Sequence, residues 1–225
     1  MNFKSIAIDG PAGAGKSTLA RKLAREFGFL YVDTGAIYRT VALKAFRVGV
    51  DPSSAEQVEP LLSAMDIRMD YGDKGEQCMY LDGEDVSKAI REHHVSALAS
   101  KVSAIPAVRA FLLDFQRKQA REHNLIMDGR DIGTVVLPNA DVKIFLTASP
   151  EARAQRRTLE LQQKGQQADF EGILRDIMER DEQDRNRPIA PLKQADDAVL
   201  VDTTNLDLAG SLEALKTAVK EGISK

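Results

Sequence analysis

The sequence predicts an α/β fold built on a parallel β-sheet, and two observations support this prediction. Short apolar runs of strand length alternate with longer segments of helical spacing along most of the 225 residues. This alternation is typical of a parallel sheet covered by helices. Glycines such as Gly28 and Gly49 stand where the helical spacing ends, as expected of helix C-termini. A chain of this length can form one large domain, or one domain with an insert.

Five apolar runs are predicted to form a five-stranded parallel core sheet, with helices on its faces. The runs lie at residues 6–9, 29–32, 125–127, 142–146 and 198–202. Helices are expected at residues 17–27, 37–46, 106–122, 150–164, 169–187 and 207–221. Pro106 and the sequence Ser149-Pro150-Glu151 are typical of helix starts, so two of these boundaries are also predicted from capping chemistry.

Residues 51–105 interrupt this alternation. Asp51-Pro52-Ser53-Ser54 predicts a helix start with a serine cap, and the runs at 67–71 and 77–81 predict a β-hairpin. A turn at 82–85 and a helix over 95–105 complete the segment. We interpret it as a small α+β insert in a single domain whose core comprises residues 1–50 and 106–225. A substrate-side subdomain is the favoured role, and a stabilising appendage is the alternative.

The first strand runs directly into a glycine-rich sequence of the form G-x-x-x-x-G-K-S, the P-loop motif. Its glycines allow several backbone N–H groups to converge on phosphate oxygens, and the following helix adds its positive N-terminus. Lys16 can reach the β- and γ-phosphates, and the Ser17 hydroxyl can bind Mg²⁺. A chance match in a turn is disfavoured by the strand before the motif and the helix after it. The predicted nucleotide-binding residues are Gly10, Pro11, Ala12, Gly13, Ala14, Gly15, Lys16, Ser17 and Thr18.

Two further strands end in an aspartate, Asp33 and Asp128. Ligands of an open parallel sheet bind beyond the carboxyl ends of its strands, where both carboxylates are expected. Mg²⁺ keeps several waters and takes few protein ligands, so each aspartate could hold it through water. For Asp33, capping of the following helix is nearly as good an interpretation. For Asp128, a metal or substrate role is favoured.

Arginines are the second indication of phosphate chemistry. Guanidinium groups match the oxygens of a transferring phosphoryl group bidentately. Arg153 and Arg157 are spaced i,i+4 and are expected on one helix face, as are Arg180 and Asp184. A solvated helix with Asp–Arg pairs has the same spacing, and this alternative stays open. The arginines expected near the phosphate site are Arg39, Arg130, Arg153, Arg157, Arg180 and Arg187.

Composition and charge bear on the partners and the cellular compartment of the protein. A net charge of −3 gives no basic field, so a nucleic-acid partner is not expected. Cys78 is the only cysteine, which fits a reducing compartment. The N-terminal run is interrupted by charge and no run approaches the ~18–20 apolar residues of a membrane span, so we expect a cytoplasmic protein without a membrane partner. A monomer is expected because no long exposed apolar stripe is evident.

The remaining P-loop functions are few. No asparagine is followed by lysine, so the N-K-x-D element of switch GTPases is missing from the sequence. The three histidines have no metal-ligand spacing with Cys78, and phosphoryl transfer needs positioning and charge stabilisation more than a nucleophile. We therefore expect a small kinase whose acceptor is itself phosphorylated. Another small-acceptor kinase and a nucleotide-gated binding protein are the alternatives.

Three further stretches resemble the bacterial cytidylate kinases, members of the nucleoside-monophosphate kinase family. They are D-T-G-A-I-Y-R from Asp33, D-G-R-D-I-G-T from Asp128 and R-D-E-Q-D-R-N-R from Arg180. The resemblance runs along essentially the whole chain, including residues 51–105. It implies a P-loop kinase that transfers the γ-phosphoryl group of ATP, with Mg²⁺, to CMP or dCMP. It also implies a short lid at about residues 153–168, in which Arg153 and Arg157 would close over ATP.

The resemblance also assigns acceptor-binding residues. It implies that Thr34, Arg39, Arg130 and Arg187 hold the CMP phosphate with Tyr38 nearby, that Ser100, Arg109 and Asp131 read the base, and that Arg180 and Asp184 contact the sugar. A carboxylate at Asp131 accepts a hydrogen bond from the cytosine N4 amine and would face the uracil O4 unpaired. Thr34 stands where serine is expected in this family, which leaves the hydroxyl in place. The residues expected to act in catalysis are Lys16, Asp128, Arg130, Arg157, Arg180 and Arg187.

Overall fold

The computed structural model describes residues 3–73 and 75–223. The chain divides into two compact units, one comprising residues up to Phe29 together with those from Asn124 onward, and the other comprising Leu30–His123. The predicted insert, residues 51–105, lies wholly within the second unit. This unit begins before the insert and ends after it. Each unit has a buried apolar interior of its own.

The first unit is built on parallel strands. β1 pairs with β6 on one side, from Ser5 opposite Leu125, and with β7 on the other, from Ile6 opposite Val142. β7 pairs in turn with β8. The complete five-stranded sheet has the order β2-β6-β1-β7-β8, which confirms the predicted α/β class. Its strands are β1 (Ser5–Asp9), β2 (Leu30–Asp33), β6 (Leu125–Gly129), β7 (Val142–Thr147) and β8 (Val199–Asp202).

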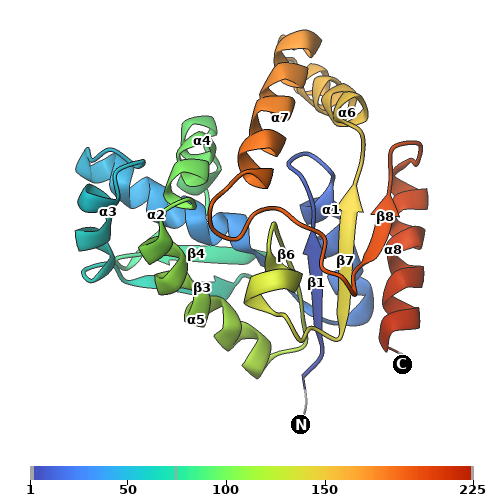
Figure 1. Cartoon of the computed structure of the whole chain (residues 1–225), viewed down its shortest axis with the longest axis horizontal. Coiled ribbons are helices and arrows are strands. Elements are labelled where there is room, and N and C mark those ends of the chain that lie inside the picture. The colour runs from blue at the N-terminus through green and yellow to red at the C-terminus, as the bar shows by residue number, and fades with distance from the viewer. Residues whose placement is uncertain (1–2, 74, 224–225) are drawn as a thin grey trace. The chain divides into compact units, whose positions relative to one another are not determined.

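The central strands are apolar because both of their faces are covered. Ile6, Ile8 and Leu125 are fully buried, as expected of parallel strands that lie between two helical layers. α1 (Lys16–Phe27) and α8 (Leu208–Ile223) pack against each other beside this sheet. α6 (Pro150–Gln163) and α7 (Phe170–Arg185) form a second helical pair. Figure 1 shows this pair beyond the carboxyl ends of β1 and β7, where ligands of such sheets bind.

Capping residues set several helix ends as predicted. Gly28 follows α1 and Gly49 follows α2 (Thr34–Val48), each in the left-handed conformation that glycine adopts without strain. Ser149 caps α6, since its Oγ accepts a hydrogen bond from the Ala152 N–H at 3.2 Å. α7 ends at Arg185, so the prediction that this helix continues to Arg187 is wrong by two residues.

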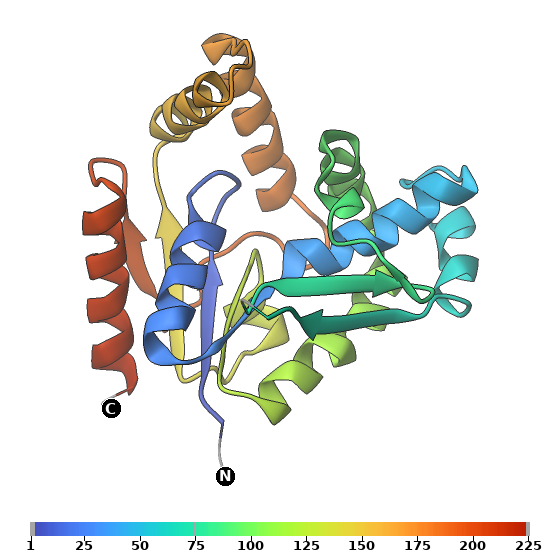
Figure 2. The ribbon, with the colours of Figure 1, turned by 180° about the vertical axis from the view of Figure 1, so that it is seen from behind.

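The second unit holds an antiparallel sheet and several helices. β3 and β4 form the predicted hairpin, and Figure 2 shows these two strands side by side. The expected serine cap is wrong in detail, because Ser54 precedes a helix but makes no side-chain capping bond. The turn predicted over 82–85 contains a short third strand. The elements are α3 (Ala55–Leu62), β3 (Ile67–Tyr71), β4 (Gln77–Leu81), β5 (Glu84–Asp85), η1 (Ala89–Arg91), α4 (His93–Val102) and α5 (Pro106–Glu122).

One element of the first unit was not predicted. Residues Ile132–Val136 form a single turn of π-helix, η2, directly after β6. Its amide groups are bonded by a residue far away in the sequence, as described below. Among the described residues, no single helix is long and apolar enough to cross a membrane. Taken together, the bent pair α4 and α5 has the necessary length and apolar composition.

Candidate functional site

The P-loop lies between β1 and α1, as the sequence predicts, and its conformation requires glycine. Gly10 has a φ of 152°, and a Cβ atom there would come within 1.9 Å of the Leu146 carbonyl oxygen on β7. Gly15, immediately before α1, has a φ of 86°. A side chain at Gly10 would therefore push the loop off the neighbouring strand, and one at Gly15 would be strained. The loop is held close to the sheet at the N-terminus of α1.

Lys16 is buried within this loop. Its Nζ donates to the carbonyl oxygens of Gly10 and Pro11, both at 2.8 Å. Burial, the main cause, and the positive charge of Arg130, the second, lower the pKa of Lys16 to about 7. Asp128 and Asp9 act in the opposite direction but do not offset the burial. The ammonium group is therefore poorly stabilised until a stronger anion is near it.

Ser17 and Asp128 meet at one point of the first unit. The Ser17 hydroxyl donates to Asp128 Oδ2 at 3.1 Å, and Asp128 is only 4% exposed. No group of three or more histidine, cysteine, aspartate or glutamate residues in the described part of the chain could form a metal site of its own. A single hydroxyl beside a single buried carboxylate fits Mg²⁺, which takes the rest of its ligands from water and phosphate.

Asp9 is a site residue that the sequence analysis missed. Its two carboxylate oxygens accept from the backbone N–H groups of Ile132 and Gly133, each at 2.7 Å. Burial raises the pKa of Asp9 to about 6, even though both hydrogen bonds favour the ionised form. The residue thereby links the end of β1 to the segment that carries Arg130 and Asp131. The signal in the sequence was a charged residue inside an apolar run, directly before the P-loop.

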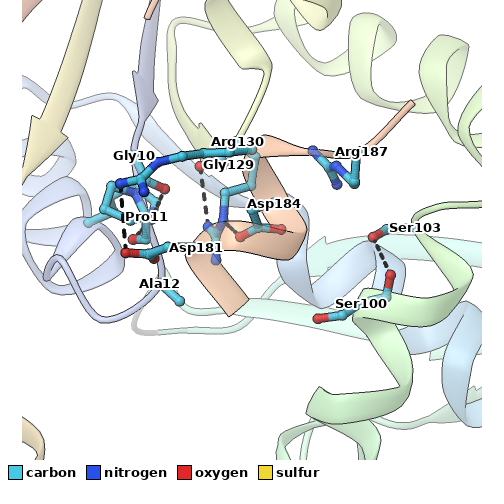
Figure 3. A network of polar contacts seen from close by, with 12 residues as sticks. Gly10, Pro11, Ala12, Ser100, Ser103, Gly129, Arg130, Asp181, Asp184 and Arg187 are labelled. Atoms are coloured by element: carbon cyan, nitrogen blue, oxygen red, sulfur yellow. Dashed lines mark hydrogen bonds and ion pairs between the residues drawn. The ribbon is translucent and has the colours of Figure 1, made fainter. Parts of the chain in front are cut away.

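Arg130 and Asp184 form an ion pair between β6 and α7. Arg130 Nε lies 2.7 Å from Asp184 Oδ2, and Figure 3 shows the two side chains facing each other. Burial alone would raise the pKa of Asp184, but the charges of Arg130, Arg187 and Arg180 hold it below its usual value. Asp184 is thus bonded to a residue 54 positions away. The alternative prediction, an Asp–Arg pair within one solvated helix, does not describe this ion pair. Three predicted arginines influence one carboxylate.

Arg153 and Arg157 stand four residues apart in α6 but have different environments. The Arg153 side chain is 1% exposed and pairs with Asp181 at 2.5 Å, whereas that of Arg157 is 45% exposed and pairs with Glu160. Arg153 also donates to the Ala12 carbonyl oxygen in the P-loop at 2.8 Å. Arg153 is therefore bonded to the P-loop, and of the two arginines Arg157 is the exposed one.

Asp33, in the second unit, caps the N-terminus of α2, one of its two predicted roles. Its Oδ1 accepts from the Ala36 N–H at 3.0 Å, and its Oδ2 pairs with Arg39 Nη2 at 2.8 Å. Gly35 makes this arrangement possible, because a Cβ there would lie 2.9 Å from Arg39 Nη1 and 3.0 Å from Asp33 Oδ1. A magnesium role for Asp33 stays a prediction. What the geometry provides is a fixed position for Arg39.

Three other predicted acceptor-binding residues of the second unit, Tyr38, Ser100 and Arg109, are linked by contacts. The Arg109 guanidinium lies over the Tyr38 ring, 5.7 Å from its centroid, and Arg109 Nη1 donates to the Ser103 carbonyl oxygen at 3.3 Å. Ser103 Oγ in turn donates to the Ser100 carbonyl oxygen, as Figure 3 shows. Arg109 is 8% exposed, and Thr34 at the start of α2 is 4% exposed. Ser100, Arg109 and Tyr38 are thus brought together.

Comparison with known proteins identifies close similarities along the whole chain. The family model described as cytidylate kinase matches residues 6–221. The cytidylate kinase of Caldicellulosiruptor bescii is 48% identical over 209 residues, covering 93% of this chain and 92% of that protein. The cytidylate kinase of Pelotomaculum thermopropionicum is 46% identical over 221 residues, covering 98% of each. In structure, an uncharacterized protein from Eubacterium ventriosum covers 99% of both chains with a TM-score of 0.51 at 12% identity, a likeness of fold alone.

Proposed function

The chain belongs to the cytidylate kinase family, and we propose on this basis that it transfers the γ-phosphoryl group of ATP to CMP or dCMP, releasing ADP and CDP or dCDP. The observation that supports the proposal most is the extent of the match, residues 6–221, which includes the P-loop and the predicted acceptor-binding residues of both units.

Lys16 is proposed to act on the donor. Its Nζ is held by two carbonyl oxygens of the loop, which are weaker acceptors than the charged oxygens of a triphosphate. Contact with the β- and γ-phosphates would raise the pKa of Lys16 from about 7, so the charged form would be restored when ATP binds. The ammonium group can then follow the γ-phosphoryl group through transfer.

Ser17 and Asp128 are the residues proposed to hold Mg²⁺. A bound Mg²⁺ would supply positive charge that offsets the negative charge developing on the phosphate oxygens during transfer. Asp128 has the better geometry of the two predicted carboxylates, since its Oδ2 already contacts the Ser17 hydroxyl. Both oxygens of Asp33 are engaged by Ala36 and Arg39, which favours a water-mediated contact for that residue.

Thr34, Arg39, Arg130 and Arg187 are proposed to hold the phosphate of the acceptor nucleotide. Arg39 has donors to offer, because its Nε is buried without a hydrogen-bond partner among the described residues. Arg130 uses its Nε on Asp184 and keeps part of its guanidinium fork for phosphate. Arg187 completes the phosphate contacts, while Arg180 and Asp184 are proposed to contact the sugar. These cations would also stabilise the transferring group.

The base is proposed to be read by Ser100, Arg109 and Asp131. Asp131 is 5% exposed, so an unmatched acceptor facing its carboxylate would remain unsatisfied away from water. The cytosine N4 amine provides the matching donor, and uracil presents an acceptor at the same position. The difference is worth about 1–3 kcal/mol, which corresponds to about 5-fold to 150-fold discrimination.

The exposed Arg157 on α6 is proposed to contact ATP when the segment at about residues 153–168 closes. Closure would exclude water, so that the phosphoryl group goes to the nucleotide acceptor and not to hydrolysis. Arg153 has a different proposed role, because its guanidinium is bonded to Ala12 and Asp181. It would hold the P-loop in place while the rest of the segment moves.

The acceptor preference can be measured by ADP release with CMP, dCMP, UMP, AMP and GMP. We expect turnover with CMP and dCMP to exceed turnover with UMP by about fivefold or more, because Asp131 matches the N4 amine. Asp131→Asn should narrow the CMP-over-UMP ratio while leaving the KM for ATP unchanged. Turnover with UMP or AMP but not CMP would overturn the proposal, and tight ATP binding without turnover on any acceptor would favour a nucleotide-gated binding protein.

A further inference from the structure

Two side chains of the hairpin in the second unit bind the backbone of β2. Gln77 Oε1 accepts from the Asp33 N–H at 2.6 Å, and Gln77 Nε2 faces the Asp33 carbonyl oxygen at 3.3 Å. The Tyr71 hydroxyl donates to the Tyr31 carbonyl oxygen at 3.2 Å. Tyr71 and Gln77 are opposite each other in the β3–β4 register, so one cross-strand pair makes all three contacts. We call this pair the hairpin clamp.

The clamp is polar, which suits the backbone N–H and C=O groups of β2 that it faces. Gln77 is 6% exposed, and a buried amide group is stable only when its donors and acceptor are bonded. The Tyr71 hydroxyl is protonated at neutral pH and can donate, and burial raises the pKa of the phenol further. Both side chains are directed at the strand end that leads into α2.

Asp33 connects the clamp to Arg39. Gln77 binds the backbone of Asp33, and the Asp33 carboxylate holds the N-terminus of α2 and the Arg39 guanidinium. A shift of the Asp33 backbone would therefore move Arg39, whose side chain is 20% exposed and whose Nε is buried without a partner in the described part of the chain. The position of Gln77 thus bears on where Arg39 presents its donors.

We propose that Gln77, assisted by Tyr71, is a positioning residue for the acceptor's phosphate, acting through Asp33 on Arg39. The hairpin then serves the acceptor site and is more than a stabilising appendage. This inference rests on the proposed role of Arg39 in binding the phosphate of CMP.

Other contacts of the same region do not provide this coupling. Lys44 pairs with Asp82 at 2.6 Å and Arg47 with Glu84 at 2.7 Å, which joins α2 to the turn between β4 and β5. These side chains are between 24% and 57% exposed, and exposed ion pairs contribute little to stability. Neither pair reaches Asp33 or Arg39, so the clamp is the contact of the hairpin that can transmit a specific effect.

The variant Gln77→Met tests the proposal, because methionine keeps the length of the side chain and removes both bonds to Asp33. We expect the KM for CMP to rise about threefold to tenfold, the effect of one or two lost hydrogen bonds, while the KM for ATP changes less than about twofold. Ser87→Ala is the matched control. It removes the Oγ that accepts from the Met79 N–H at 2.9 Å, a bond to the same strand that does not involve Asp33, and should leave both KM values within about twofold of the parent values.

A second arm separates the inference from the proposed function. In an Arg39→Ala background, Gln77→Met should change the KM for CMP by less than about twofold, because the residue it positions is gone. An equal effect in both backgrounds, or a lower melting temperature with unchanged KM, would overturn the inference. An unchanged KM for CMP in Arg39→Ala alone would instead overturn the phosphate role of Arg39. Should Gln77→Met not fold, Tyr71→Phe removes only the hydroxyl and should raise the KM for CMP about twofold in the same background-dependent way.

Discussion

Lys16 and Asp9 are the buried charged residues on either side of the glycines of the P-loop, and burial moves their pKa values toward each other. That of Lys16 falls to about 7, and that of Asp9 rises to about 6. Both residues therefore carry a charge near neutral pH that the interior stabilises poorly. We derive one prediction about the response of the protein to pH from each of these pKa shifts.

For Lys16 we predict that binding of ATP takes up protons at pH 8. The free protein holds Lys16 mostly neutral at that pH, and the phosphates would raise its pKa well above 8, so uptake should approach about 0.9 proton per site. Calorimetric titration in two buffers of different ionisation enthalpy measures this number directly.

The same titration at pH 6 should show little uptake, because Lys16 is already charged there. Lys16→Met provides the control and should bind ATP more weakly with no uptake from this site. Equal heats in the two buffers at pH 8 would contradict the predicted pKa shift.

For Asp9 the prediction concerns stability. Its pKa in the folded protein, about 6, lies above the unfolded value of 3.8, so its contribution to stability is fully present below pH 3.8 and is lost as the pH rises through 6. The ionised form costs about 3 kcal/mol relative to the protonated one. Asp9→Asn should therefore make the free energy of unfolding rise more steeply with pH between 4 and 6 than it does in the parent protein.

Urea unfolding at several pH values between 4 and 7 measures this slope, which does not depend on how much stability the substitution itself removes. Parallel curves for the variant and the parent protein would show that Asp9 does not titrate in this range. Because Asp9 also holds the amides of Ile132 and Gly133, the variant tests the support of the neighbouring segment as well.

At the scale of elements, the buried pair Arg153–Asp181 joins α6, α7 and the P-loop. We predict that Arg153→Met lowers the free energy of unfolding by about 3–5 kcal/mol, because it leaves the Asp181 carboxylate buried without its main partner. The double variant Arg153→Met/Asp181→Leu should recover most of that loss, since an apolar pair replaces the charges.

The KM for ATP distinguishes support of the loop from simple packing. It should stay raised in the double variant, because the bond to the Ala12 carbonyl oxygen is lost in both variants. Recovery of both stability and KM would mean that Arg153 contributes packing alone. Urea unfolding and steady-state kinetics on the same preparations supply the two measurements.

The elements with local signals could be predicted from the sequence, and those held by distant residues could not. Gly28, Gly49 and Ser149 end or begin helices through chemistry that lies within a few positions of them. The π-helical turn Ile132–Val136 has no such signal, because its amides are bonded by Asp9, more than 120 residues away. β5 was missed because two exposed residues beside a turn carry no alternating pattern.

The candidate site divides in the same way. Lys16, Ser17 and Asp128 follow from a motif and a strand end, since each lies where the chain leaves the sheet. The burial of Arg153 could not be foreseen from its spacing to Arg157, because its partners Ala12 and Asp181 come from other parts of the chain. Partners that are distant in the sequence decide that Arg153 is buried while Arg157 is exposed.

At the scale of the molecule, the strand order and the division into units lie beyond what spacing alone predicts. β1 lies between β6 and β7, strands that follow it by more than 100 residues. The compact second unit begins at Leu30 and ends at His123, although the change in sequence pattern lies at residues 51 and 105. Packing in the folded chain, and not the point at which the pattern changes, sets these boundaries.

The function proposed for this chain is transfer of a phosphoryl group from ATP to CMP. Phosphorus-31 NMR of a mixture of the protein with ATP, Mg²⁺ and CMP tests it most directly, because donor, products and free phosphate give separate signals. ADP and CDP should appear in equal amounts, and inorganic phosphate should not accumulate. Loss of ATP to ADP and inorganic phosphate with no CDP signal would contradict the proposed function.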